Sequence, residues 1–91
     1  MTEKEYNIHI FNQGQSLDAI VNQQGWRVVE QFLDDICKDA ETRLVKTDPA
    51  DTSRIIAAHA FAHASRDTQH KLLSQIEETI AASQNLGNEI N

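Results

Sequence analysis

The sequence predicts an all-α protein, built as an antiparallel two-helix hairpin preceded by a short extended N-terminal arm. An Asp48-Pro49 hinge separates two long segments, 26–46 and 49–84, and each carries apolar residues at helical spacing along one side. Two helices of this kind leave apolar surface uncovered, so we expect oligomerisation or docking on a larger protein to complete the fold. The predicted organisation is an arm and linker over 1–16, a hairpin over 17–86 with its hinge at 47–51, and a loose tail over 87–91.

Composition narrows the class of protein. The 91 residues suffice for one domain and carry 14 acidic against 8 basic side chains, a net charge of −6. The basic residues are scattered and form no patch suited to phosphates, so we expect no nucleic-acid partner. No stretch approaches the about 20 apolar residues of a membrane span, so we expect no membrane partner. A single cysteine and a polar N-terminus without a signal-peptide core lead us to expect a reducing cytoplasm or a particle assembled there.

The N-terminal segment 1–16 alternates apolar and polar residues. Tyr6, Ile8 and Ile10 are separated by single polar positions, and Phe11 follows them. This period of two is typical of a strand. Two interpretations are open. One is an arm that adds a strand to the sheet edge of a partner. The other, which the usual looseness of chain termini favours, is a mobile tail whose apolar side chains pack on the helices.

The first long helix is predicted over 26–46. Ser16 is placed to cap a short helix before it, and a boundary or kink is expected at 22–25, where a glycine disfavours helix. Asp34 and Lys38, one turn apart, would form a weakly stabilising ion pair. The apolar stripe of this helix consists of Trp26, Val29, Leu33, Ile36, Cys37, Ala40 and Leu44, with Phe32 on its flank.

The hinge supplies the clearest helix start. Asp48 is predicted as the N-cap, Pro49 as the first helical residue and Asp51 as an acidic residue of the first turn. The second long helix should run to about Gln84, with Gly87 as the residue that terminates it. Its stripe consists of Ile55, Ala58, Phe61, Ala62, Ser65, Leu72, Leu73, Ile76 and Ile80, and a weaker track beside it consists of Ile56, Ala60 and Ala64.

One group of side chains in the second helix could carry chemistry. His59, His63 and Asp67 follow one another at one-turn intervals, and His70 lies near the same face. Imidazole and carboxylate groups at this spacing can share a metal ion, but the glutamate of a zinc-protease motif is absent. We interpret the group as a solvent-exposed histidine face. Two alternatives remain open, an interface that responds to histidine protonation and a metal site formed by His59, His63 and Asp67.

The other reactive side chains favour structural roles. Cys37 lies within the apolar stripe and is predicted as a buried thiol. The adjacent carboxylates at 34–35 and 77–78 point apart on a helix, so neither pair can converge as acid and base. Trp26 is predicted to anchor the hairpin core, and a binding hot spot is the alternative. We therefore expect no enzymatic activity and no cofactor.

Two stretches resemble small helical-hairpin proteins of tailed bacteriophages. These are IVNQQGWRVVEQFL at 20–33 and TDPADT at 47–52. The shared pattern is a Gly-Trp, a charged amphipathic helix, an Asp-Pro turn and a second helix, and it covers about residues 20–80. The resemblance implies a virion accessory, connector or assembly role among head and head-tail proteins, with no catalytic residues to transfer. The chain departs from that pattern in its N-terminal arm and in a second helix rich in Ala and His.

The function predicted from these features is docking. We expect a multicopy structural protein of a virion, assembled in the host cytoplasm, whose partners are other copies of itself and a larger capsid or connector protein. An acidic face on the first long helix supports an alternative, a small regulator or inhibitor of a host or defence protein. That face consists of Asp34, Asp35, Asp39 and Glu41. The predicted partner-binding residues are Tyr6, Ile8, Ile10, Phe11, Trp26, Phe32 and Ile56.

Overall fold

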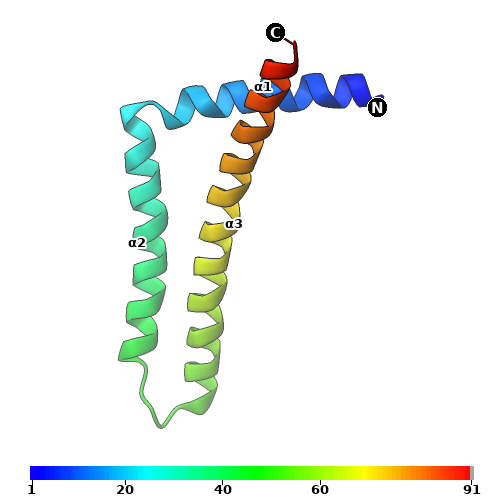
Figure 1. Cartoon of the computed structure of the whole chain (residues 1–91). Coiled ribbons are helices and arrows are strands. Elements are labelled where there is room, and N and C mark those ends of the chain that lie inside the picture. Colours follow the sequence, from blue (N-terminus) through cyan, green and yellow to red (C-terminus); the bar gives the residue numbers. More distant parts are fainter. Residues whose placement is uncertain (91) are drawn as a thin grey trace. The chain divides into compact units, whose positions relative to one another are not determined.

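Three α-helices make up most of residues 1–90 (Figure 1). The computed structural model describes the backbone of residues 1–90 and the side chains of residues 1–89. The helices are α1 (Glu3–Val21), α2 (Gln24–Lys46) and α3 (Thr52–Ile90). The predicted all-α class is therefore confirmed, but with three helices in place of two, and none of residues 1–90 lies in a strand. No helix in this part of the chain is long and apolar enough to cross a membrane.

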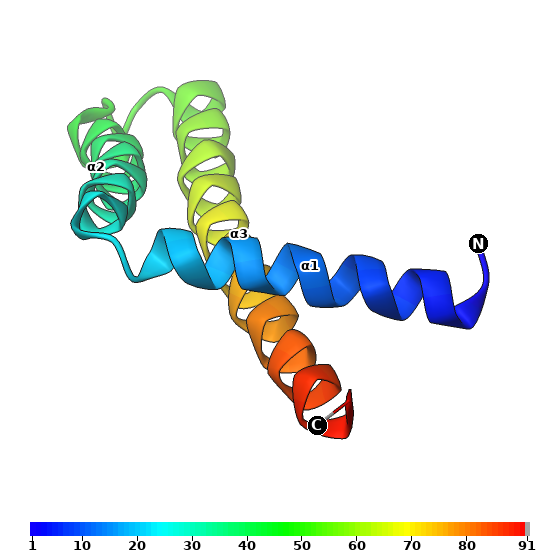
Figure 2. The same cartoon turned by 90° about the horizontal axis from the view of Figure 1, so that it is seen from above.

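The chain divides into two compact units. Unit 1 combines Met1–Arg27 with the segment from Leu72 onward, so it contains α1 and the C-terminal half of α3. Within this unit, α1 crosses α3 instead of running alongside it (Figure 2). Unit 2 is Val28–Lys71 and contains most of α2, the turn after it and the N-terminal half of α3. The two helical segments of unit 2 run side by side, joined by the short turn.

The prediction of an extended N-terminal arm is wrong, because residues 3–21 form a continuous helix. Thr2 caps this helix, since its side-chain oxygen accepts a hydrogen bond of 3.2 Å from the backbone N–H of Glu5. Ser16, predicted to cap a shorter helix, lies inside α1. The least exposed positions recur at helical spacing and are Asn7, Ile10, Phe11, Gly14, Leu17, Asp18 and Val21. Tyr6 and Ile8 are exposed on the same helix.

The boundary predicted at 22–25 is confirmed, because α1 ends at Val21 and α2 begins at Gln24. Asn22 is the C-cap of α1. Its side-chain amide donates to the carbonyl oxygen of Asp18 at 2.8 Å, and its backbone N–H donates to the same oxygen at 3.2 Å. These bonds satisfy a carbonyl that the helix end would otherwise leave without a partner.

The connection between α2 and α3 is a turn with Pro49 at its second position. The N–H of Asp51 donates to the carbonyl of Asp48 at 2.9 Å, and the Asp48 carboxylate accepts from the N–H of Ala50 at 2.9 Å. The Asp51 carboxylate accepts from the N–H of Arg54 at 3.1 Å, and Asp51 therefore caps α3. The cap predicted at Asp48 is wrong, because that residue closes the turn instead.

The C-terminal end of α3 also differs from the prediction, since the helix continues past 84–87 to Ile90. Gly87 lies inside the helix and has no positive φ. A Cβ at Gly87 would lie 3.2 Å from the ring of Phe11, so the glycine allows α1 to approach closely. The tail predicted to be loose is helical as far as Ile90, and Asn91 lies outside the described residues.

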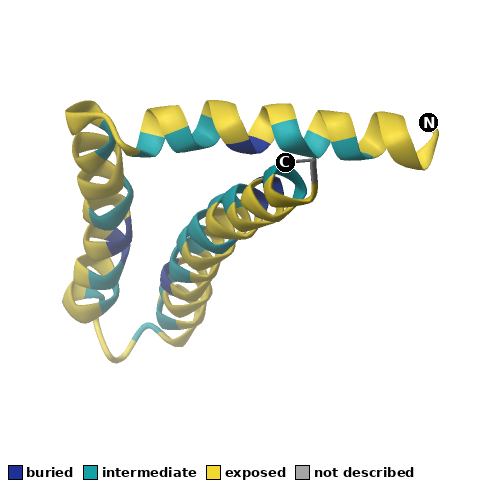
Figure 3. Ribbon diagram, turned by 45° about the horizontal axis from the view of Figure 1, so that its top comes forward, coloured by how far each residue is buried: buried dark blue, intermediate teal, exposed yellow. Residues whose placement is uncertain are grey.

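Small side chains fill the contacts between helices within each unit. Buried and half-buried positions form only narrow lines along the helices (Figure 3). The buried residues of unit 2 are Cys37, Ala40 and Ala62, and those of unit 1 are Gly14, Thr79 and Ser83. Such residues let helix backbones approach closely, but each removes little apolar area from water. The burial predicted for Cys37 is confirmed.

Candidate interaction surfaces

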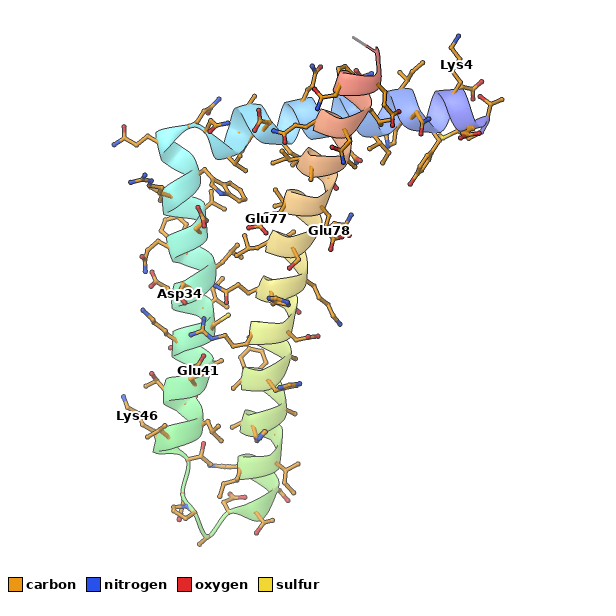
Figure 4. The ribbon with its side chains drawn as sticks, in the orientation of Figure 1. Lys4, Asp34, Glu41, Lys46, Glu77 and Glu78 are labelled. Atoms are coloured by element: carbon orange, nitrogen blue, oxygen red, sulfur yellow. The ribbon has the colours of Figure 1, made fainter. Side chains whose placement is uncertain are left out.

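A hydrogen-bonded cluster around Arg66 joins the two helical segments of unit 2. The Arg66 guanidinium, from α3, donates through Nη1 to the Asp34 carboxylate at 2.7 Å and through Nε to the Glu41 carboxylate, both on α2 (Figure 4). Nη1 also donates to Gln69 Oε1 at 3.0 Å. The same oxygen accepts a weak bond from the Cys37 thiol at 3.7 Å. One arginine therefore satisfies two carboxylates and links the two helical segments.

The charges of this cluster shift the pKa values of Asp34 and Arg66. The pKa of Asp34 is lowered to about 2, first by its hydrogen bond to Arg66 and then by Lys38, whose ammonium lies 2.9 Å away. The ion pair predicted between Asp34 and Lys38 is thereby confirmed. The pKa of Arg66 is raised, first by Glu41 and then by Asp34. All of these groups stay partly exposed, so solvent screens the attraction between them.

The predicted acidic face is largely neutralised within the chain. Asp34 and Glu41 share Arg66, and Asp39 pairs with Arg43 at 3.0 Å. The fourth member, Asp35, accepts a hydrogen bond of 2.8 Å from the side chain of Gln31. Carboxylates that are already paired attract a basic partner less strongly than free ones.

The opposite side of unit 2 carries several exposed apolar side chains. At about 100° per residue, Ile36 lies about 160° around α2 from Asp34, and Phe61 lies about 140° around α3 from Arg66. Because Asp34 and Arg66 meet on one side of the helix pair, Ile36 and Phe61 lie toward the other. We call this surface the apolar face of unit 2, and its members are Val29, Phe32, Ile36 and Phe61. Phe32 is 62% exposed, Ile36 58% and Phe61 52%.

The histidine face of α3 is exposed, as predicted. His59, His63 and His70 are all exposed, and Asp67 forms an ion pair of 2.8 Å with Lys71. That ammonium is the main cause of the lowered pKa of Asp67, with smaller contributions from His63 and His70. No group of three or more His, Cys, Asp or Glu side chains among the described residues is placed to hold a metal ion. The metal alternative gains no support from this arrangement.

Unit 1 carries a groove of about 420 Å³ beside α1. Ile8, Phe11 and Leu86 supply its apolar part, and the remaining lining residues are polar or charged. The exposed Tyr6, two positions before Ile8, lies about 160° from it around α1 and is not part of the lining. The full lining consists of Glu3, Lys4, Asn7, Ile8, Phe11, Leu86 and Glu89.

The predicted partner-binding residues fall into separate groups. Tyr6 and Ile8 are exposed on α1, whereas Ile10 and Phe11 are half-buried. Trp26 is also half-buried, which favours the predicted packing role. In unit 2, Phe32 and Ile56 are both exposed but lie on opposite sides of the helix pair, since Ile56 is two turns before His63 on the histidine side.

The residues that sequence reasoning missed are Ile36, Phe61 and Arg66. Ile36 and Phe61 were assigned to the core stripes, yet both are exposed. Arg66 is a basic residue among Ser65, Thr68 and Gln69, where the α3 stripe lacks large apolar residues, and it lies opposite an acidic α2. This placement is a signal that could have identified it. The adjacent carboxylates Glu77 and Glu78 project from different sides of α3, as predicted (Figure 4).

Comparison with known proteins adds no relative: the chain matches no protein-family model, no curated protein sequence and no solved structure.

Proposed function

We propose that the chain is a non-enzymatic structural protein that docks on a larger protein assembly. The observation that carries this proposal is the distribution of side-chain size. The buried apolar residues are small, namely Cys37, Ala40 and Ala62, while phenylalanine and isoleucine side chains remain in water. Apolar surface exposed in this way marks sites of interaction in proteins that otherwise stay soluble.

The groove of unit 1 is the proposed contact with the larger partner. Ile8 and Phe11 supply apolar side chains to it from α1. A concave apolar surface with a charged rim suits an apolar side chain presented by another protein. The resemblance of 20–33 and 47–52 to tailed-phage hairpin proteins supports a virion as the assembly, with a capsid or connector protein as the larger partner.

The state of the reactive groups supports a role without catalysis. Cys37 is buried, and its thiol donates a weak hydrogen bond to Gln69. Asp67 forms an ion pair with Lys71. Nucleophiles and general bases need access to substrate, and these side chains are either covered or engaged with cations. The regulator or inhibitor hypothesis is less well supported, because the Arg66 cluster neutralises part of the acidic face.

Co-sedimentation tests the proposal. The purified chain would be mixed with virus particles isolated from cells that produce the chain. The mixture would then be centrifuged at low and at high salt. We expect binding that is insensitive to salt, since apolar docking depends little on charge. An Ile8→Glu variant should bind at least about tenfold more weakly, as expected for loss of an apolar anchor in the groove. Val45→Glu, an exposed position in unit 2, is the matched control.

Point substitutions are preferable to removing the N-terminal segment. Deletion of residues 1–12 would also remove Phe11, whose backbone carbonyl and ring contact α3. Loss of binding by a truncated chain could then reflect damage to unit 1. A chain that stays in the supernatant under all conditions, or binds only at low salt to a basic partner, would contradict the proposal.

A further inference from the structure

We propose, building on the docking function above, that the apolar face of unit 2 joins two copies of this chain face to face. The face is formed by two helical segments lying side by side, and its members are Val29, Phe32, Ile36 and Phe61. Two helix pairs that each have one apolar side complete a four-helix arrangement when those sides meet. A contact of this kind is isologous, because the same surface serves both partners.

Charge favours a second copy as the occupant. The chain has a net charge of −6, so most surfaces would repel another copy. On α2 the carboxylates of Asp34 and Glu41 lie on the opposite side and are engaged with Arg66. The charged residues on or beside the face are paired within the chain, Arg43 with Asp39 at 3.0 Å and Arg54 with Asp51 at 3.2 Å. Two copies can therefore meet here without burying an unpaired charge, which would strongly oppose association.

The area of the face is enough for a weak dimer. The nineteen residues of α2 from Val28 to Lys46 rise about 28 Å, and two packed helices are about 20 Å wide. One side of unit 2 thus offers a contact area of about 550 Å² per copy, or about 1,100 Å² for the two copies together. This total lies just under the usual range of buried surface in specific interfaces. We therefore expect a dissociation constant in the micromolar range.

Sedimentation equilibrium of the full chain tests this inference with two pairs of matched variants. Phe32→Glu and Phe61→Glu each place a charge on the apolar face. Val45→Glu and Ile56→Glu place the same charge at positions 84% and 65% exposed on the same helices, toward the opposite side. We expect wild type to form dimers, the first pair to raise the dissociation constant by about 30-fold or more, and the second pair to leave it unchanged. Circular dichroism would verify that helicity is retained.

A mixing experiment tests whether the contact is between identical faces. Ile36→Glu and Ile36→Lys should each be monomeric alone, and an equimolar mixture should regain dimers, because opposite charges then meet across the contact. A wild-type chain that remains monomeric at high concentration would overturn the inference, as would equal weakening by all four glutamate variants. Co-sedimentation with particles would still support the docking function in that case, so the two proposals can fail separately.

Discussion

The Ser83 hydroxyl donates a hydrogen bond of 2.8 Å to the backbone carbonyl of Phe11, which ties α3 to α1 within unit 1. Gly14 faces the same serine one turn further along α1. A Cβ on Gly14 would overlap the Ser83 side chain and would lie 2.8 Å from the carbonyl oxygen of Thr79. The two helices thus cross through a glycine and two small hydroxyl residues, all of them buried.

Replacing Gly14 with alanine should destabilise unit 1. The added methyl group cannot be accommodated beside Ser83 unless the helices separate, and overpacking of this kind costs about 1–3 kcal/mol. Chemical denaturation followed by circular dichroism would measure the change in the free energy of unfolding.

Gly25→Ala is the matched control, because no atom lies within 4 Å of a Cβ built at that position in α2. There the better helix propensity of alanine should raise the free energy of unfolding by about 0.5–1 kcal/mol. Equal stabilisation by both substitutions would show that Gly14 is not a close-contact position.

Removing the Ser83 hydroxyl should have a smaller effect. Ser83→Ala keeps the small volume that Gly14 requires and loses one buried hydrogen bond, worth about 1 kcal/mol. Ser83→Val, which adds volume at the crossing, should be more damaging than alanine. If urea unfolding shows the alanine variant to be the less stable of the two, packing at this crossing does not control stability.

The Arg66 cluster should make stability depend on acid pH. The pKa of Asp34 falls from its ordinary 3.8 to about 2 in the folded chain. Because the folded-state value is the lower one, this carboxylate stabilises the fold fully above about pH 4 and loses its contribution as the pH falls toward 2. Wild type should therefore be more stable than Asp34→Asn in urea at about pH 5, and the difference should shrink toward pH 2.

Asp39→Asn is the control for this pH series. It removes an exposed ion pair with Arg43 on the same helix and should change the unfolding midpoint little at any pH. A difference between wild type and Asp34→Asn that stays constant, or widens in acid, would exclude the Asp34–Arg66 bond as its source.

Titration with zinc or nickel should release no heat of binding. His59 and His63 are exposed, and the carboxylate that could join them, Asp67, is held by Lys71. Isothermal titration calorimetry of the full chain would measure this directly. Stoichiometric binding that disappears in His63→Ala would instead establish a metal site on the histidine face.

Much of the fold could be predicted from sequence where large apolar residues set the helical period. The stripe of α2 runs without interruption through Leu33, Cys37 and Leu44, and its boundaries are predicted to within two residues. In α1 the inner face carries Asn7 and Gly14 at positions usually apolar, so its helical period is hidden. The alternation of Tyr6, Ile8 and Ile10 with single polar residues then suggests a strand. The Thr2–Glu5 spacing, typical of a helix N-cap, was the contrary signal.

The candidate surfaces could be predicted only in part. Sequence pattern identifies which residues share a helix face, and it led to Phe32 and Ile56 as exposed anchors. It could not show that Ala40 and Ala62 would be buried between the two helical segments of unit 2 while Ile36 and Phe61 stay exposed to water. That outcome depends on how two helices rotate about their axes when they pack, which is set jointly by both sequences.

Quantitative mass spectrometry of particles purified from cells that produce the chain tests the central claim most directly. Docking on a larger assembly predicts a fixed number of copies of the chain per virus particle. That number should be a simple multiple of the number of subunits in the capsid or in a connector ring. Recovery of the chain only in the soluble lysate, with none in the particles, would contradict the account.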